Sequence, residues 1–330
     1  MLRALIFTVL LLAAAAGGTW LLLVDAPPVD GQAVEFTISD GQPFLEVAAG
    51  LERDRLVNSA VRVDLLARIT GMDRKIKAGT FRVERGTRPL RLLDDLAYGR
   101  ALLRRLTVRE GWRMDQIAQA VQDSLKVSAK DFEAAAHDSA RCARVGTRGK
   151  NLEGYLFPDT YMFPDRVPAG DVVDKMLEHF EEVWRELPGA AAVASRDDVV
   201  TLASIVEAET PLSEERPRVA AVYLNRLALG MKLQADPTVR YGLGYFDEHL
   251  YFKQLDVDTP YNTYMHEGLP PGPIGSPGRE SLQAALAPAR PCDYLFFVAS
   301  GQGGHVFSKT KEEHDRAHER ARRAAKNASG

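Results

Sequence analysis

The chain has 330 residues, of which 45% are hydrophobic and 26% charged, a balance typical of globular proteins and unlike that of disordered chains. The 42 Lys and Arg residues nearly match the 45 Asp and Glu residues, and the net charge of -3 comes with no basic stripe, which excludes a nucleic-acid partner. Only two cysteines are present, Cys142 and Cys292. They could pair outside the cytoplasm, but two thiols alone do not establish a disulfide.

An almost uninterrupted apolar run, Ala4 to Val24, lies near the start of the chain. As a helix it is long enough to cross a hydrocarbon core of about 30 Å. Arg3 and the free amine put positive charge on its short N-terminal side, which predicts a cytoplasmic N-terminus and places the rest of the chain across the membrane. A cleaved signal peptide is the alternative, but the apolar run continues from Trp20 past any cut near residues 13–16. We therefore predict that residues 1–28 are a single-pass anchor and short linker.

Residues 29–108 have the pattern of a small α/β module. Alternating apolar residues predict a strand around residues 34–38, and helical periodicity predicts helices from Phe44 to Leu56 and from Ala60 to Ile69. A strand over residues 77–83 completes a strand-helix-helix-strand order, which the glycan-binding LysM module shares. Order alone is weak evidence, so glycan binding and a plain stalk are both open for this module.

A short helix over residues 89–98 and a strand over residues 102–108 are predicted next. Residues 109–150 carry the apolar face of a further helix, and we assign them to a connecting α/β segment. Residues 151–330 form the larger predicted domain. The expected fold class is therefore α+β, with a transmembrane helix, a LysM-like βααβ module and a mixed α/β domain.

Aromatic, Gly and Pro residues become dense after Asn151, in segments that lack helix or strand periodicity. Examples are residues 153–161 and the long loop of residues 261–274, which its prolines stiffen. A loop rich in Tyr, Asn and Thr suits a carbohydrate, because rings pack on the apolar faces of sugars while amides and hydroxyls bind sugar hydroxyl groups. Such segments also occur as plain surface cover, so composition leaves both interpretations open.

The most informative residue of the larger domain is Glu209, a carboxylate on an apolar helical stripe. A helix is predicted over residues 198–211, and its stripe consists of Leu202, Ile205 and Val206. Glu207 points away from this stripe, so the two acids cannot share one site. Apolar surroundings and the negative end of the helix dipole predict a raised pKa for Glu209, which could then donate a proton to a leaving oxygen. A structural pair with an arginine such as Arg226 is the alternative, and this helix alone does not decide between them.

Six motifs of this domain occur together in one order. They are residues 202–210, 225–227, 230–239, 261–264, 268–274 and 303–307. The set closely resembles the MltG/YceG-like endolytic murein transglycosylases, and residues 77–83 and 153–161 also match that family. The resemblance extends from the anchor to about His314. Because many separate motifs agree in order and spacing, it is far more specific than one short signature.

The resemblance implies a bitopic inner-membrane protein with a LysM-like module and a catalytic domain in the periplasm. The family's catalytic acid is the second Glu of its Glu-x-Glu-Thr pattern, which is Glu209 here. The implied reaction is non-hydrolytic cleavage of the β-1,4 bond between N-acetylmuramic acid and N-acetylglucosamine in nascent strands, which leaves 1,6-anhydromuramic ends and limits strand length. Ordinary glycosidases use two carboxylates, whereas here one Glu would protonate the leaving oxygen and then accept the proton of the C6 hydroxyl.

The implied partners are peptidoglycan glycan strands and the inner membrane, with cell-wall synthases such as penicillin-binding proteins as further candidates; no cofactor or metal is expected. The residues expected to bind substrate beside Glu209 are Gln234, Asp236, Asn225, Tyr261, Asn262 and Glu153. Each has a structural alternative, because Asp236 opens a helix-start signature and Asn225 could satisfy buried backbone groups. The role of His305, which follows two glycines, is left open.

Two other functions are consistent with parts of the sequence. A metallohydrolase is suggested by His314 and His318, four residues apart on a predicted helix, but a zinc protease needs a Glu directly after the first His, where Asp315 stands. The many charged residues nearby predict a solvated helix instead. The other function is a non-enzymatic peptidoglycan-binding scaffold for cell-wall synthases, which would keep its cellular role in a Glu209→Gln variant.

Overall fold

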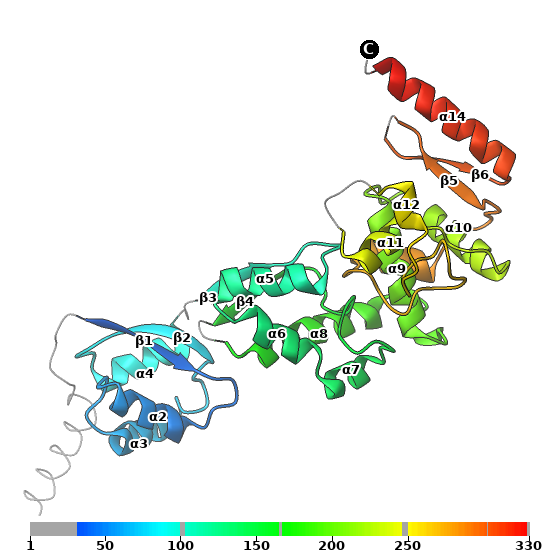
Figure 1. The fold of residues 1–330 in the computed structure, drawn as a ribbon. Helices are drawn as coiled ribbons and strands as arrows, with labels where there is room; N and C mark the ends of the chain where they lie inside the picture. Colours follow the sequence, from blue (N-terminus) through cyan, green and yellow to red (C-terminus); the bar gives the residue numbers. More distant parts are fainter. Residues whose placement is uncertain (1–31, 100–102, 165–166, 246–249, 302, 329–330) are drawn as a thin grey trace, which may run out of the picture. The chain divides into compact units, whose positions relative to one another are not determined.

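The structure is a computed structural model that describes residues 32–328 except for 100–102, 165–166, 246–249 and 302 (Figure 1). The chain divides into two compact units. Unit 1 comprises residues up to Leu106 with two short later segments, 124–126 and 161–167, and unit 2 comprises the remainder. The predicted anchor, residues 1–28, lies outside the described residues. In the described part of the chain, no helix combines the length and the apolar character needed to cross a membrane.

The elements of unit 1 follow the order predicted from the sequence. They are β1 (Ala33–Ile38), α2 (Phe44–Arg53), α3 (Ala60–Thr70), β2 (Gly79–Glu84) and α4 (Pro89–Tyr98). β1 pairs with β2 in antiparallel register, so that Ala33 lies opposite Glu84 and Ile38 opposite Gly79. The strand-helix-helix-strand order is therefore confirmed, whereas the relation to LysM modules stays a prediction.

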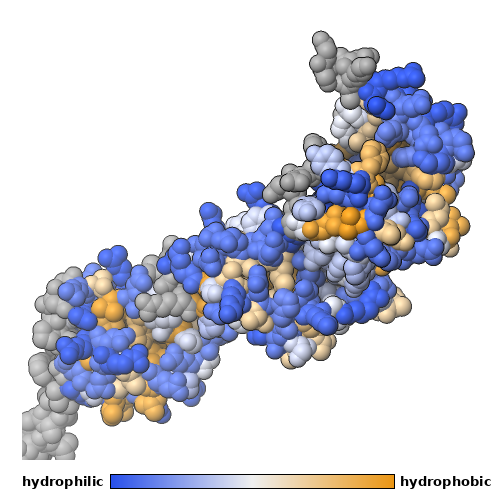
Figure 2. Space-filling view, viewed as in Figure 1, coloured by the Kyte–Doolittle hydropathy of each residue, from blue (hydrophilic) through white to orange (hydrophobic). Residues whose placement is uncertain are grey.

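The core of unit 1 is made by the inward side chains of this β1–β2 ribbon and of the helices. α3 begins where Ser59 accepts a hydrogen bond from the Arg62 amide and ends at Gly71, whose φ of 65° is readily adopted by glycine. The enclosed apolar residues include Phe36, Leu51, Leu66, Phe81, Leu92 and Leu96. On the outer side of the unit, Figure 2 shows apolar surface over α2 and α3, to which the exposed residues Val61, Leu65 and Ile69 belong.

A second pair of strands, β3 (Leu103–Thr107) and β4 (Thr160–Pro164), forms a separate two-stranded sheet. The helices of the first part of unit 2 are α5 (Met114–Leu125), α6 (Ala129–Ala136), α7 (Ser139–Val145) and α8 (Ala169–Glu186), followed by a 3-10 turn at Ala190–Ala192. α8 packs against α6 and α7. Tyr155, from the aromatic stretch before β4, is buried with its ring 5.1 Å from that of Phe180 on α8.

The last part of unit 2 surrounds one central helix, α9. Its elements are α9 (Arg196–Glu209), α10 (Arg216–Ala228), α11 (Asp236–Leu243), α12 (Phe252–Leu255), α13 (Arg279–Leu286), β5 (Phe296–Ala299), β6 (His305–Ser308) and α14 (Lys311–Ala328). α9 packs against α10, α11 and α13, while α14 packs against the β5–β6 hairpin (Figure 1). Ser195 caps the start of α9 by accepting a hydrogen bond from the Asp198 amide. The mixed α/β class predicted from the sequence is confirmed.

Candidate active site

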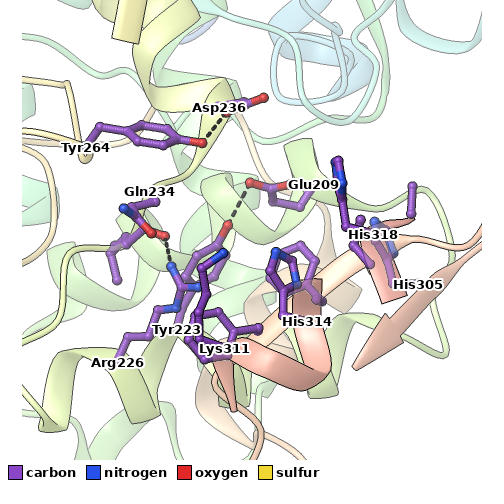
Figure 3. A pocket seen from close by; sticks show the side chains of 15 residues that line it. Glu209, Tyr223, Arg226, Gln234, Asp236, Tyr264, His305, Lys311, His314 and His318 are labelled. Carbon is purple, nitrogen blue, oxygen red and sulfur yellow. Dashed lines mark hydrogen bonds between the residues drawn. The ribbon is translucent and has the colours of Figure 1, made fainter. Parts of the chain in front are cut away.

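The side chain of Glu209 opens onto a cavity of about 410 Å³ (Figure 3). Its walls come from α9, α10, the segment that leads into α11, the β5–β6 hairpin and α14. The lining residues are Glu209, Tyr223, Arg226, Leu233, Gln234, Asp236, Tyr264, Phe296, Phe297, Val298, Ala299, His305, Lys311, His314 and His318. Acids, aromatic rings and histidines therefore face one space, although they are spread over more than 100 residues of the chain.

Glu209 is the last residue of α9 and is partly exposed to the cavity. Its Oε1 accepts a hydrogen bond from the Tyr223 hydroxyl at 2.7 Å. Burial raises the pKa of Glu209 to about 7, the Tyr223 hydrogen bond opposes this rise, and the nearby carboxylate of Asp236 adds to it. A carboxyl group with this pKa is present in both forms near neutral pH, so it can give a proton and take one back.

Arg226, the suggested partner of Glu209, makes its hydrogen bonds elsewhere. Its Nε donates to the carbonyl of Leu295 at 2.6 Å, and its Nη1 donates to the carbonyl of Leu233 at 2.7 Å. The guanidinium lowers the pKa of Glu209 only through its charge, as a smaller contribution than burial. Arg226 thus ties α10 to the segments around Leu233 and Leu295, which frame the cavity. Glu209 instead accepts its hydrogen bond from Tyr223.

Glu207, two residues earlier on α9, has a separate environment, as the helical spacing predicts. Its Oε1 lies 2.8 Å from Nη2 of Arg216, and both side chains are almost fully buried, with exposed fractions of 8% and 6%. Its Oε2 accepts the backbone N–H of Gly278 at 3.0 Å. Glu207 therefore joins α9 to α10 and to the start of α13, whereas Glu209 faces the cavity.

Gln234 and Asp236 are the predicted substrate-binding residues that the structure brings together with Glu209. Gln234 has a φ of 52°, in the left-handed region that non-glycine residues adopt at a cost of about 1–3 kcal/mol, and its N–H donates to the Thr263 carbonyl at 3.1 Å. Asp236 begins α11 and accepts the Tyr264 hydroxyl at 2.7 Å. Both side chains are exposed to the cavity and free to meet a ligand.

Asn225 and Asn262 lie outside the lining of this cavity. The amide of Asn225 donates to the carbonyls of Cys292 and Tyr294 at 3.1 and 3.0 Å, which holds the segment before β5 against α10. Asn262 is fully buried, and its amide donates to two carbonyls in and just after α12, each at 2.8 Å. In both residues the amide satisfies backbone carbonyls, the structural alternative considered for Asn225.

Tyr261 and Glu153 belong to another cluster. The Tyr261 ring lies 4.8 Å from that of Tyr241, whose hydroxyl donates to Glu153 Oε2 at 3.1 Å. Glu153 is buried and accepts the N–H of Met114 with both carboxylate oxygens, at 3.0 and 3.2 Å. Burial raises the pKa of Glu153 to about 7, and the hydrogen bond from Met114 opposes the rise. This acid closes the N-terminus of α5 and does not line the cavity with Glu209.

Several lining residues were not identified from the sequence as site residues. Tyr223 is not among the residues that the sequence predicts for the site, yet it lines the cavity. The sequence predicts a solvated helix around His314 and His318, yet both face the cavity. The His314 ring stacks on Phe296 with centroids 5.4 Å apart.

Within residues 32–328, apart from the gaps given above, no three His, Cys, Asp or Glu side chains converge in a way that could hold a metal ion. Cys142 and Cys292 are free thiols.

Comparison with known proteins identifies the family to which this chain belongs. The sequence profile of the YceG-like family matches residues 36–320, which is most of the chain. The chain belongs to the YceG-like family. The resemblance drawn from its motifs is thereby confirmed.

Named relatives align with most of the YceG-like chain. An endolytic murein transglycosylase of Bacillus subtilis is 32% identical over 87% of this chain and 84% of its own length. An endolytic murein transglycosylase of Streptococcus pneumoniae is 28% identical over 94% of this chain and 63% of its own length. A solved structure of a yceG-like protein from Listeria monocytogenes has a TM-score of 0.59 and 30% identity, and the match covers 86% of this chain and 99% of that one.

Proposed function

We propose that this YceG-like protein is an endolytic murein transglycosylase with Glu209 as its catalytic acid and base. The observation that carries the proposal is a carboxyl group with a pKa of about 7 in a cavity of about 410 Å³. A cavity of this volume is within the range of small-ligand sites. The names of the Bacillus and Streptococcus relatives support murein as the substrate.

The proposed reaction needs one residue to move one proton in two directions. Protonated Glu209 donates its proton to the glycosidic oxygen as the bond from C1 of N-acetylmuramic acid breaks and the electron pair goes to that oxygen. The C6 hydroxyl oxygen of the same sugar then bonds to C1, and its proton passes to the Glu209 carboxylate. The acid is regenerated and no water is consumed. Tyr223 holds the carboxylate in place and keeps its pKa near neutrality.

Gln234 and Asp236 are proposed to bind the glycan strand, because their side chains face the same cavity as Glu209. The unusual backbone of Gln234 supports this role, since left-handed non-glycine residues cluster at functional sites. Tyr261, Asn262, Asn225 and Glu153 are proposed to act on the strand through the segments that they hold in place. The apolar run at Ala4 to Val24 supports a single-pass anchor in the inner membrane, with the cavity on the periplasmic side.

The test is a digestion of un-crosslinked nascent glycan strands by the full-length protein, followed by mass spectrometry of the products. We expect internal fragments with 1,6-anhydromuramic ends from the native protein and intact strands with Glu209→Gln. Reducing ends would instead mean hydrolysis. Strands left intact by the native protein, together with cells in which Glu209→Gln supports normal growth, would favour the non-enzymatic scaffold for cell-wall synthases.

A further inference from the structure

We propose that the β5–β6 hairpin forms a subsite for the N-acetyl group of a sugar beside Glu209. In this subsite His305 accepts a hydrogen bond from the acetamido N–H, and the hairpin surface next to it packs against the acetyl methyl. The inference rests on the proposed function, because it names the substrate group that the same cavity recognises. It makes His305 a specificity-determining residue with no part in the proton transfer.

A buried carboxylate fixes the ring of His305. Glu215 Oε2 lies 2.7 Å from His305 Nδ1, and Glu215 Oε1 accepts the backbone N–H of His305 at 2.8 Å. Burial raises the pKa of Glu215, but the hydrogen bonds from His305 outweigh it and hold the pKa below its usual value. An ionised carboxylate can only accept, so Nδ1 carries the ring hydrogen. In the neutral tautomer that has its hydrogen on Nδ1, Nε2 is a hydrogen-bond acceptor on a ring that lines the Glu209 cavity.

The backbone around His305 is shaped for this contact. Gly304 has a φ of 77°, and a Cβ at this position would lie 2.6 Å from Glu215 Oε1. Glycine therefore permits the close approach of the carboxylate to the start of β6. Glu215 also reaches Thr210, the residue after Glu209, whose hydroxyl donates to Oε2 at 3.4 Å. The imidazole is thus tied to the end of the helix that carries the catalytic acid.

The surface beside His305 is apolar. Ala299 on β5 is paired directly with His305 on β6, and residues opposite each other on an antiparallel pair have their Cβ atoms about 4.5–5.5 Å apart on one face. The ring of Phe297 meets that of His305 edge to face at 5.3 Å. Phe297, Val298 and Ala299 all line the cavity.

The combination of these features selects the ligand group. A sugar hydroxyl can use a hydrogen-bond acceptor but has no apolar part to place on Ala299. An acetamido group offers one N–H and one methyl a few ångströms apart, which matches an acceptor next to an apolar patch. Figure 3 shows His305 on the side of Glu209 away from Gln234 and Tyr264. A sugar between these walls would have its acetamido group toward the hairpin and its hydroxyl groups toward Gln234.

Binding can be measured without cleavage in the full-length Glu209→Gln protein, by calorimetry with short murein strands and with the same strands after chemical de-N-acetylation. We expect the acetylated strands to bind at least tenfold more tightly. The key variant is His305→Asn, because the Asn amide can still donate to Glu215 from the position of Nδ1 but has no atom at the position of Nε2. It is expected to reduce the acetyl preference to less than threefold.

A second variant acts on the other half of the subsite. Ala299 is exposed, so Ala299→Leu leaves the fold intact and fills the space proposed for the methyl group; it should also lower the acetyl preference. The matched control is His266→Asn, which changes a histidine whose Nε2 pairs with Asp258 at 2.7 Å outside the cavity lining. It should keep the full preference, with melting temperatures recorded for all three proteins.

The outcomes separate the two proposals. An acetyl preference that persists in both folded variants, or that is missing from the Glu209→Gln parent, overturns the subsite. Failure of the native protein to release anhydromuramic ends overturns the proposed reaction instead, and the binding comparison still decides the subsite. Loss of the preference in His305→Asn and in Ala299→Leu, with the control unchanged, establishes both halves of the subsite.

Discussion

The Tyr223 hydroxyl and Glu209 Oε1 are 2.7 Å apart, and this hydrogen bond lowers the pKa of the candidate catalytic acid. Burial pushes the pKa of Glu209 up, and the hydrogen bond that Tyr223 donates to the carboxylate pulls it back toward about 7. Without the phenol the acid would hold its proton more tightly and would be a weaker base for the second half of the reaction. Tyr223 is thus a positioning residue that also tunes the acid.

Tyr223→Phe should therefore move the alkaline limb of the pH profile. Native activity requires protonated Glu209, so kcat/KM is expected to fall as the pH rises through about 7. Removal of a hydrogen bond to the charged form raises the pKa of Glu209, and the limb should move up by about one pH unit. Tyr98→Phe, at an exposed tyrosine of unit 1, is the control and should leave the profile in place. A limb that stays put or moves to lower pH would contradict the assigned contact.

The Glu→Gln substitution should lower activity at Glu209 and stability at Glu207, although both acids lie on α9. Glu209→Gln is expected to lower kcat by about 10²–10⁴-fold, because general acid–base catalysis contributes that much. It should cause no loss of unfolding free energy, because a neutral amide avoids the burial cost that raises the pKa of this carboxyl. Glu207→Gln should keep the chemistry but lower the unfolding free energy by about 1.5–3 kcal/mol, because it weakens the buried contact with Arg216. Kinetics and denaturant unfolding of both variants provide the check. Equal losses of activity would remove the distinction between the two acids.

The sequence predicted the parts of the site that depend on local spacing. The separation of Glu207 from Glu209 follows from about 100° per residue along one helix. The helix-start signature at Asp236 matches the first residue of α11, but the N-cap is Ala235 and no side chain caps this helix. α9 is, however, buried on most of its sides by three neighbouring helices. Its apolar residues therefore extend well beyond one stripe.

Other parts of the site depend on tertiary packing that no local pattern records. Tyr223 reaches Glu209 only because α10 packs against α9. His314 lies on a strongly charged helix, and it faces the cavity because α14 covers the β5–β6 hairpin and stacks this ring on Phe296. Asn225 looked like a glycan ligand by residue type, but whether an amide meets a sugar or a backbone carbonyl is decided by the carbonyls that the fold brings near it.

Two adjacent glycines provide a matched test of the contact between Glu215 and His305. Gly303 and Gly304 have φ values of 85° and 77°, so an alanine at either position costs about 1–2 kcal/mol in backbone strain. A Cβ on Gly303 meets no atom within 4 Å, whereas one on Gly304 lies 2.6 Å from Glu215 Oε1. Gly303→Ala should lower the unfolding free energy by the backbone strain alone. Gly304→Ala should lower it by about 1–3 kcal/mol more, because of the clash with Glu215, and should also weaken glycan binding. Equal effects in calorimetry and binding would argue against the close approach.

Glu153 should make the stability of the protein depend on pH. Burial raises its pKa from 4.5 to about 7 in the folded chain, so its contribution to stability is full below about pH 4.5 and is lost as the pH rises toward 7. In that window the unfolded chain releases the proton while the folded chain keeps it, a loss of about 1.4 kcal/mol per pH unit. Glu153→Gln removes this dependence. The unfolding free energy of the variant, relative to that of the native protein, should therefore increase from pH 4.5 to 7 and stay constant at higher pH. Urea unfolding at several pH values measures the difference, with Glu178→Gln on the exposed face of α8 as the control. A constant difference between native protein and Glu153→Gln across this window would mean that the buried carboxyl is ionised throughout, held by the Met114 amide and the Tyr241 hydroxyl.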